Sequence, residues 1–258
     1  MIDLKKILLS LLSLILIITF CFVGRLLYIQ ANSREGICVL GYHGVVSDEE
    51  KEEKYSDNRY YLSESEFTKQ MQYLYDHGYT TLSMDEVYNY YTGNDEDVEK
   101  RVCLTFDDGL KNFNTVVKPI LEKYNFKGTC FVIGKHLDDD NELFLKSEDI
   151  INTELVEYYS HSYNLHRKAS GFDRKIIQEL TLEEIDEDFK MNTISCEYFA
   201  FPYGRSVEGI EDVLRDHGVK LAFSYNQFRH LTRNDDQYYL PRYMMVDLMP
   251  MFYFKYIV

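Results

Sequence analysis

The sequence predicts an α/β fold in which helices surround a parallel sheet. Short apolar segments rich in β-branched and aromatic residues alternate along the chain with segments whose apolar residues recur at helical spacing. Such alternation is typical of parallel sheets, which bind ligands at the carboxyl ends of their strands. Several of the predicted strands end in aspartate, histidine or a proline–glycine turn. We therefore expect the functional residues to meet at that edge of the sheet.

The composition is that of one large, acidic domain. Of the 258 residues, 45% are hydrophobic and 15% aromatic, which is enough to bury one substantial core. The net charge is −15, and it becomes −17 for residues 31–258 because the first thirty residues hold three basic residues and one acidic residue. Nucleic-acid binding is disfavoured, since phosphate backbones require a basic surface. The acidic surface can retain a cationic polymer or simply keep the domain soluble.

The first thirty residues are predicted to anchor the chain in a membrane. Lys5 and Lys6 precede an apolar segment over residues 7–23 that reaches about 26 Å as a helix, near the lower limit for a bilayer. No small-residue cleavage pattern follows, which favours an uncleaved signal anchor over a secreted protein with a removed signal peptide. The lysines place the N-terminus in the cytoplasm. We expect residues 1–30 to form a cytoplasmic stub and transmembrane anchor, and residues 31–258 an extracellular domain.

The domain is predicted to begin with one strand and two capped helices. Residues 36–42 form an apolar strand that ends at His43, and the polar residues 47–61 are expected to form a mobile loop. The pattern Ser-x-x-Glu at residues 63–66 and again at 83–86 is a capping box, and each copy precedes an apolar helical stripe.

The first chemical motif closes the predicted strand 101–106. Asp107 and Asp108 would point to opposite faces of a continuing strand, so both can face one pocket only if the backbone turns, which Gly109 permits. Two adjacent carboxylates resist ionising together, but if one binds a cation the other can act as a base. The alternative is an ordinary turn after a strand.

Two histidines five residues apart form the second motif. Positions five apart lie about 140° apart around a helix, so His161 and His166 can meet at one ion only through a loop. Two imidazoles and one carboxylate leave coordination positions open, as in catalytic metal sites. Taken alone, the two histidines are equally compatible with ordinary surface or core positions.

The remaining elements continue the alternation. We expect helices over residues 115–124, 148–155, 181–192 and 207–216, and strands over 128–134, the residues just before 161, 198–201 and 221–225. Cysteines lie in apolar segments at spacings that fit no zinc ribbon, so we assign them no disulfide: Cys38, Cys103, Cys130 and Cys196.

Three motifs in this order resemble the polysaccharide deacetylase family, also called the NodB-homology or carbohydrate esterase family 4 enzymes. They are TFDDG at 105–109, HSYNLH at 161–166 and FAFPYG at 199–204, and the resemblance covers about residues 36–245. GYHGV at 41–45 and the histidine spacing look most like the poly-N-acetylglucosamine deacetylase branch, whose members act on exopolysaccharide at the cell surface. The resemblance implies a distorted, incomplete (β/α)7 barrel of the NodB-homology type.

The resemblance also implies roles for the candidate residues. A divalent ion, zinc first and cobalt or nickel as alternatives, would be held by Asp108, His161 and His166, while Asp107 acts as the base. The backbone N–H of Tyr203, in the turn Pro-Tyr-Gly, would stabilise the oxyanion. The alternative for that turn is an ordinary connection from strand to helix.

Two departures from the family pattern concern the base and the acid. The arginine that usually precedes Pro-Tyr-Gly is absent, and Arg242 is a possible replacement. The usual C-terminal histidine is also absent, because no histidine follows His230. In the exopolysaccharide branch the histidine of the first strand resembles a permuted substitute, so His43 is the candidate general acid. A histidine that only caps the strand is the alternative.

These residues predict a metal-dependent hydrolase. The leading function is N-deacetylation of a cell-surface N-acetylglucosamine polymer, of the poly-β-1,6-N-acetylglucosamine type, with release of acetate. Peptidoglycan is the alternative substrate. A membrane-anchored carbohydrate-binding protein with little turnover is the alternative from another class, which the missing arginine makes conceivable. The expected partners are the polysaccharide and the membrane.

Overall fold

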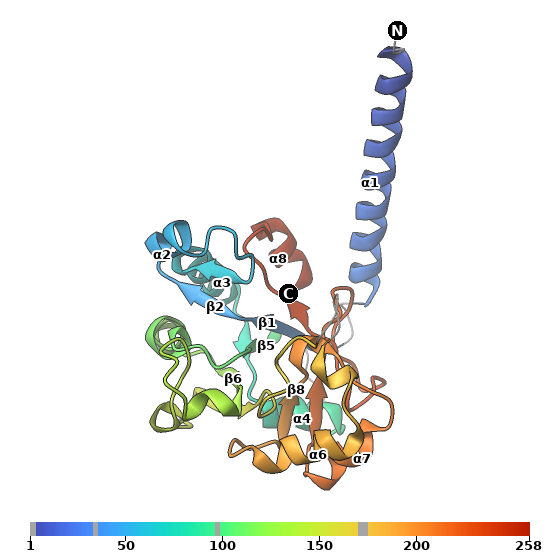
Figure 1. Cartoon of the computed structure of the whole chain (residues 1–258). Coiled ribbons are helices and arrows are strands. Elements are labelled where there is room, and N and C mark those ends of the chain that lie inside the picture. Colours follow the sequence, from blue (N-terminus) through green and yellow to red (C-terminus); the bar gives the residue numbers. More distant parts are fainter. Residues whose placement is uncertain (1–3, 33–35, 96–98, 170–174) are drawn as a thin grey trace.

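A long helix stands away from an α/β body in the computed structural model, which describes residues 4–32, 36–95, 99–169 and 175–258 (Figure 1). The helix is α1, Leu4–Asn32, and the rest of the chain forms the body. Its central sheet is parallel in every pairing between named strands and follows the order β10-β1-β5-β6-β7-β8-β9, with β4 beside β5. The strands are β1 Cys38–Tyr42, β4 Thr80–Thr81, β5 Arg101–Phe106, β6 Gly128–Val132, β7 Val156–Ser160, β8 Tyr198–Ala200, β9 Leu221–Phe223 and β10 Tyr243–Met244.

The sheet curls because one short segment joins its two edges. Tyr243 and Met244 form β10 beside β1, while Leu240, three residues before Tyr243, makes backbone hydrogen bonds with Ala222 and Ser224 at the other edge. The segment between them, which contains Arg242, therefore lies where the barrel closes. The predicted α/β fold with an incomplete parallel barrel is confirmed: seven strands form the main path, and β4 is an eighth strand beside β5.

Helices cover the outer surface of this curled sheet, and a second, two-stranded sheet lies beside it (Figure 1). The small sheet pairs β2 with β3. Every helix of the body is shorter than α1. The bounds are β2 Gly44–Val46, β3 Tyr61–Ser63, α2 Asp48–Glu53, α3 Glu64–Asp76, α4 Met84–Tyr91, α5 Lys118–Tyr124, α6 Leu182–Met191, α7 Ile210–Asp216 and α8 Met251–Ile257. The capping boxes predicted at Ser63 and Ser83 are formed, and Thr181 makes a third at the start of α6.

Two local expectations are wrong. The polar segment 47–61 is not simply a loop, since Ser47 caps the helix α2 within it. No α-helix covers 148–155, where a 3-10 turn at Ser147–Asp149 is followed by irregular chain. There the side chain of Thr153 accepts from the N–H groups of Leu155 and Val156, and Asn152 accepts from that of Tyr158. These side chains satisfy backbone donors that would otherwise favour a helix.

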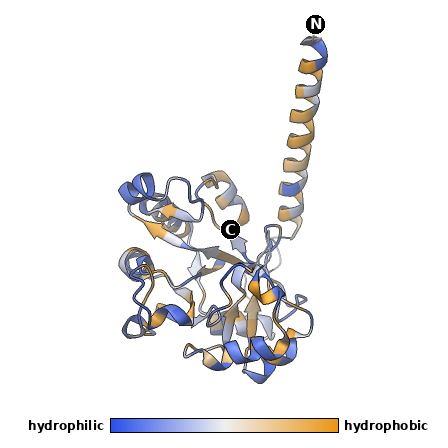
Figure 2. Ribbon diagram, in the orientation of Figure 1, coloured by the Kyte–Doolittle hydropathy of each residue, from blue (hydrophilic) through white to orange (hydrophobic). Residues whose placement is uncertain are grey.

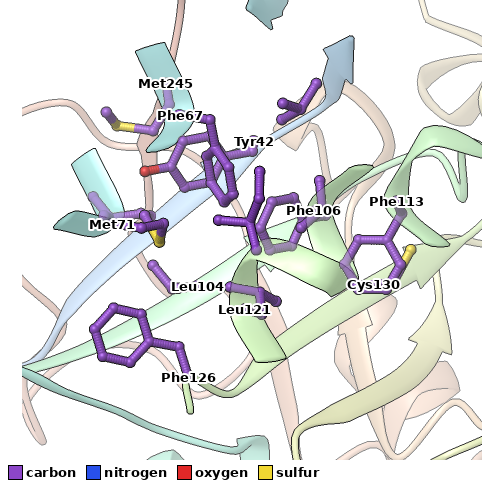
Figure 3. Close-up of a cluster of buried hydrophobic side chains, with 14 of the residues drawn as sticks. Tyr42, Phe67, Met71, Leu104, Phe106, Phe113, Leu121, Phe126, Cys130 and Met245 are labelled. Carbon is purple, nitrogen blue, oxygen red and sulfur yellow. The ribbon is translucent and has the colours of Figure 1, made fainter. Parts of the chain in front are cut away.

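The two faces of the sheet have separate cores, which follows from the alternation of side chains along each strand. In β5, Leu104 and Phe106 point outward into the cluster shown in Figure 3, together with Tyr42 of β1 and Phe67 of α3. Cys103 points the other way, into the cluster enclosed by the curled sheet. Asp107, the first residue after β5, continues this alternation and therefore points toward the enclosed side, as Cys103 does.

The long helix α1 is apolar along its length and is fixed to the body at its end (Figure 2). Lys5–Ala31 is long and apolar enough to cross a membrane, and the most apolar window of this segment is 0% buried. At the other end Ile29 is fully buried, and Arg25 donates hydrogen bonds to the Tyr253 hydroxyl and to the Gln227 carbonyl. The end of the helix is thus held against α8.

A glycine at the end of β5 gives a test of this architecture. Gly109 has a φ of +69°, and a Cβ added there would lie 3.1 Å from the Cα of Val132. We expect Gly109→Ala to lower the free energy of unfolding by about 2–4 kcal/mol. Two effects add up: an alanine is strained in a left-handed backbone conformation, and its Cβ would crowd Val132. Gly78→Ala is the matched control, because Gly78 has a φ of +72° with nothing within 4 Å. Denaturant unfolding measures both, and equal losses would show that the Val132 contact relaxes without cost.

Candidate active site

One carboxylate and two imidazoles converge at the carboxyl ends of β5 and β7. The Oδ1 atom of Asp108 lies 3.6 Å from Nε2 of His161 and 3.3 Å from Nε2 of His166. One ligand atom from each residue lies within 4.8 Å of the other two. Oδ1 of Asp108 and Nε2 of His161 are buried without a hydrogen-bond partner among the described residues. Buried polar atoms normally have partners, so these residues fit a metal ion.

Residues with a left-handed backbone conformation bring these side chains together. Asp108 has a φ of +76° and Gly109 one of +69°, so the chain turns directly after β5 and both aspartates face the same cleft. Aspartate tolerates this conformation better than most residues do. Ser162 makes a similar turn after β7, with a φ of +70°. The carboxylate of Asp188 accepts hydrogen bonds from the backbone N–H groups of Tyr163 and Asn164, in the loop that carries His166.

His161 is held in the tautomer that a metal ligand requires. Its Nδ1 lies 2.7 Å from the carbonyl oxygen of Ala200, which can only accept, so Nδ1 carries the proton and Nε2 keeps its lone pair toward Asp108. Burial lowers the pKa of His161 to about 4, although the neighbouring aspartates act in the opposite direction. The imidazole is therefore neutral at pH 7.

Asp107 is completely enclosed and ion-paired. Arg242 donates to both of its carboxylate oxygens, from Nη1 at 2.8 Å and from Nη2 at 2.9 Å. Burial by itself raises the pKa of Asp107, but the guanidinium lowers it well below its ordinary value. Arg242 is in turn fixed by Thr105, whose hydroxyl accepts from Nη1 at 3.0 Å. The residue named as a possible replacement for the family's arginine thus lies against the candidate base.

A tyrosine that the sequence reasoning missed completes this arrangement. The hydroxyl of Tyr225 donates to Oδ2 of Asp107 at 2.6 Å, and its ring lies beneath the Arg242 guanidinium, 4.4 Å from ring centre to Cζ. Burial raises the pKa of Tyr225 well above its ordinary value, so the hydroxyl keeps its proton. Oδ2 then accepts two hydrogen bonds and Oδ1 only one, which leaves Oδ1 with room for a further donor. Tyr225 is the last residue of the predicted strand 221–225 and lies just after the observed strand β9, so the expectation that functional residues lie at strand ends could have found it.

His43 lies directly after β1 and faces the same cleft. Its ring centre is 5.2 Å from that of Tyr60 and 6.4 Å from that of Tyr225. Its Nδ1 is buried and has no hydrogen-bond partner among the residues that the structure describes. A histidine that only caps a strand would use its ring in a hydrogen bond, and this contact is missing from the described part of the chain.

Tyr203 lies in the Pro-Tyr-Gly turn that follows β8. Its φ is +59°, a conformation that is strained for a residue with a side chain. Its ring stacks on that of His166 with centres 4.2 Å apart. The carbonyl of Gly204 accepts from the hydroxyls of Ser224 and Tyr239, which holds the turn in place. The expected role of the Tyr203 backbone N–H toward an oxyanion remains a prediction.

All seven predicted site residues lie in or beside one cleft. Its volume is about 460 Å³, and all of them except Arg242 line it, while Arg242 lies behind Asp107. The residues that sequence reasoning did not single out are Asn58, Tyr60, Tyr61, Lys168, Lys175, Arg205, Tyr225 and Met244. Most of them lie in loops, where no hydrophobic period indicates which way a side chain points. The five cysteines are all unpaired, and none lines the cleft.

Together these features define an α/β-barrel protein with a candidate metal centre at the carboxyl ends of its strands. Residues 94–222, half of the chain, match the family model described as polysaccharide deacetylase. The chain therefore belongs to the polysaccharide deacetylase family, whose members are hydrolases.

Relatives with more specific names agree with this assignment. The chain is 28% identical over 204 residues to the poly-beta-1,6-N-acetyl-D-glucosamine N-deacetylase of Staphylococcus aureus (strain NCTC 8325 / PS 47), covering 73% of this chain and 69% of that protein. Among solved structures, IcaB from Ammonifex degensii matches with a TM-score of 0.69 and 25% identity, over 81% of this chain and 91% of that one. A de-N-acetylase from Aggregatibacter actinomycetemcomitans has a TM-score of 0.70 at 22% identity, over 86% and 99%, which shows the same fold.

The metal assignment can be tested without an activity assay. We expect the chain, stripped by a chelator and then dialysed against zinc, cobalt or nickel, to retain one ion, because two neutral imidazoles and one carboxylate are already assembled. His166→Ala should lose most of this stoichiometry, since it removes one ligand atom. His77→Ala is the control, because His77 lies at the exposed end of α3. Elemental analysis gives the result, and full retention in His166→Ala would contradict the assignment.

Proposed function

We propose that this protein removes N-acetyl groups from a cell-surface N-acetylglucosamine polymer in a metal-dependent reaction that releases acetate. The preferred substrate in this proposal is a poly-β-1,6-N-acetylglucosamine exopolysaccharide, the polymer in the name of the Staphylococcus aureus relative. The observation that carries the proposal is the presence in one cleft of an assembled ligand triad and a buried, ionised carboxylate beside it.

Hydrolysis of an amide needs an activated water, stabilisation of an oxyanion and a proton for the leaving amine. Asp108, His161 and His166 would hold the divalent ion, with zinc as the leading choice. When bound, such an ion supplies a Lewis acid that polarises a carbonyl and lowers the pKa of water. The remaining steps belong to the residues around these three.

Asp107 is suited to accept the proton of the attacking water. Arg242 and Tyr225 fix the carboxylate and saturate Oδ2, so that Oδ1 is the atom with capacity for another hydrogen bond. The depressed pKa keeps Asp107 ionised at any working pH, although it also makes the carboxylate a weak base. Its contribution therefore depends on orientation as much as on basicity.

His43 and Tyr203 supply the other two functions in this proposal. The ring of His43 lines the cleft, and in this proposal it protonates the departing amine. The N–H of Tyr203 would donate to the oxyanion from the strained turn. The rings of Tyr60 and Tyr61 line the same cleft and offer flat faces for a sugar.

Two other functions are compatible with the same cleft. Peptidoglycan deacetylation would use the same chemistry on another polymer. A carbohydrate-binding protein without turnover was conceivable because the motif arginine is absent, but Arg242 lies where it can orient Asp107. Its ion pair with Asp107 and the intact ligand triad favour an enzyme.

The decisive experiment measures acetate release by the metal-reconstituted chain. We expect release from poly-β-1,6-N-acetylglucosamine, little from peptidoglycan, and none from either polymer after a chelator removes the metal. Asp107→Asn should keep the metal and lower turnover by about 10²-fold or more, because base catalysis typically contributes that much. Loss of metal in Asp107→Asn would mean that the roles of the two aspartates are exchanged. No release from any polymer would leave the carbohydrate-binding alternative.

The acid role of His43 can be separated from a structural role by changing the leaving group. We expect His43→Ala to keep its fold and its metal but to lose turnover on the amide. It should lose much less on an activated acetate ester, whose leaving group needs no proton. Equal losses on the two substrates would count against the acid role, and unchanged amide turnover would exclude it.

We further propose that α1 is an uncleaved anchor and that residues 31–258 lie outside the cell. The basic residues precede the apolar segment, and the end of the helix is fixed to the body through Arg25. Protease added to intact cells should digest the domain and leave residues 1–23 in the membrane fraction. A soluble chain that lacks its N-terminal segment would show instead that the segment is a cleaved signal peptide.

A further inference from the structure

Two adjacent tyrosines of the cleft differ in how much of each ring a ligand can reach. The ring of Tyr61 stacks on that of Tyr55, with centres 4.1 Å apart and planes 6° apart. Gly44 lies against the same ring, so closely that an added Cβ would collide with it. Tyr60 is 39% exposed and also lines the cleft, with its ring centre 5.2 Å from that of His43. A sugar that enters the cleft beside His43 therefore meets the ring of Tyr60.

One lysine fixes the chain that carries this ring. Tyr60 lies in the irregular chain between α2 and β3, where no ladder of backbone hydrogen bonds holds it. Nζ of Lys51, on α2, donates to the carbonyl oxygens of Tyr55 and Asn58, both at 2.9 Å. It also donates to Oδ2 of Asp247 at 2.7 Å. An ammonium group has three N–H donors, so these three acceptors use all of them.

Asp247 connects the same chain to the strand that closes the barrel. It lies shortly after β10, and its N–H donates to the carbonyl of Arg59, the residue before Tyr60, at 3.0 Å. The side chains of Lys51 and Asp247 are 13% and 14% exposed. Oδ1 of Asp247 is buried and has no hydrogen-bond partner among the described residues. The carboxylate thus depends on Lys51, since a charge that is removed from water needs its counter-charge.

We propose that Tyr60 is the stacking platform for the sugar next to the one that loses its acetyl group, and that Lys51 and Asp247 are positioning residues that hold this ring at the cleft. The inference rests on the proposed function, because it specifies how the same cleft holds its polymer. The C–H groups on the face of a sugar ring pack on an aromatic face without any counter-charge, which suits a neutral polymer. A ring that is fixed before binding loses less conformational freedom when the sugar arrives.

The test uses the full-length, metal-loaded chain in detergent and a neutral oligosaccharide of β-1,6-linked N-acetylglucosamine. Acetate release gives kcat and KM, and calorimetry gives Kd. We expect Tyr60→Ala to raise KM and Kd roughly tenfold, about the size of one aromatic contact. Tyr60→Phe keeps the ring and should restore most of the lost affinity.

Variants of the ion pair test the positioning role. Lys51→Met should raise KM and Kd by a similar factor, with a much smaller change in kcat and the same metal content. Asp247→Asn keeps an acceptor for the ammonium but removes the charge, so we expect a smaller rise of about threefold. Lys54→Met is the matched control, because Lys54 is 61% exposed and pairs with Glu50 on the surface. It should match the wild type.

A double variant shows whether Lys51 acts through the ring of Tyr60. With Tyr60→Ala already present, Lys51→Met should raise KM and Kd no further, since the group that it positions is gone. Effects that multiply in the double variant would overturn the positioning role. If Lys51→Met fails to fold, Asp247→Asn combined with Tyr60→Ala decides the same question.

Unchanged KM and Kd in Tyr60→Ala would overturn the platform. Absence of acetate release by the wild type would contradict the proposed function instead. The Kd values of the wild type, Tyr60→Ala and Lys51→Met would then still decide whether Tyr60 binds the glycan.

Discussion

The buried pair of Asp107 and Arg242 is the interaction on which the rest of the structure depends. Both side chains are completely enclosed, and two charges without water are tolerated only when their hydrogen bonds are made. Thr105, Ser224 and Tyr225 supply or accept those bonds from β5 and from the end of β9. Because Arg242 belongs to the segment that joins the two edges of the sheet, the same contact closes the barrel and orients the candidate base.

Backbone strain is concentrated around this pair. Five described residues other than glycine have a positive φ, and three of them adjoin the cleft: Asp108, Ser162 and Tyr203. Each follows a different strand of the sheet, at a point where the chain turns sharply. Such conformations persist only where the surrounding structure enforces them, and they occur disproportionately at functional sites. The hydrogen bonds of Asp188 to the histidine loop and of Ser224 to Gly204 provide that enforcement.

Side chains of both charges line the cleft. The carboxylates near the strand ends are committed, one to Arg242 and the other to the ligand triad. Lys168 and Arg205 also line the cleft, and both side chains are exposed, so their charges are not part of the buried pair. The acidic surface that the composition indicates therefore does not describe the site, because net charge averages over groups that the fold separates.

Features that depend on neighbouring residues could be predicted from the sequence. The capping boxes, the buried strand 101–106 and the turn at Asp107–Gly109 depend on neighbouring residues, and each was predicted correctly. The helix expected over 148–155 does not form, because the side chains of Asn152 and Thr153 accept hydrogen bonds from backbone N–H groups there. The contacts of Arg242 and Tyr225 with Asp107 follow from no local pattern, since they span 135 and 118 residues. Closing the barrel brings them together, and no local pattern encodes which distant residues a curled sheet places at one end.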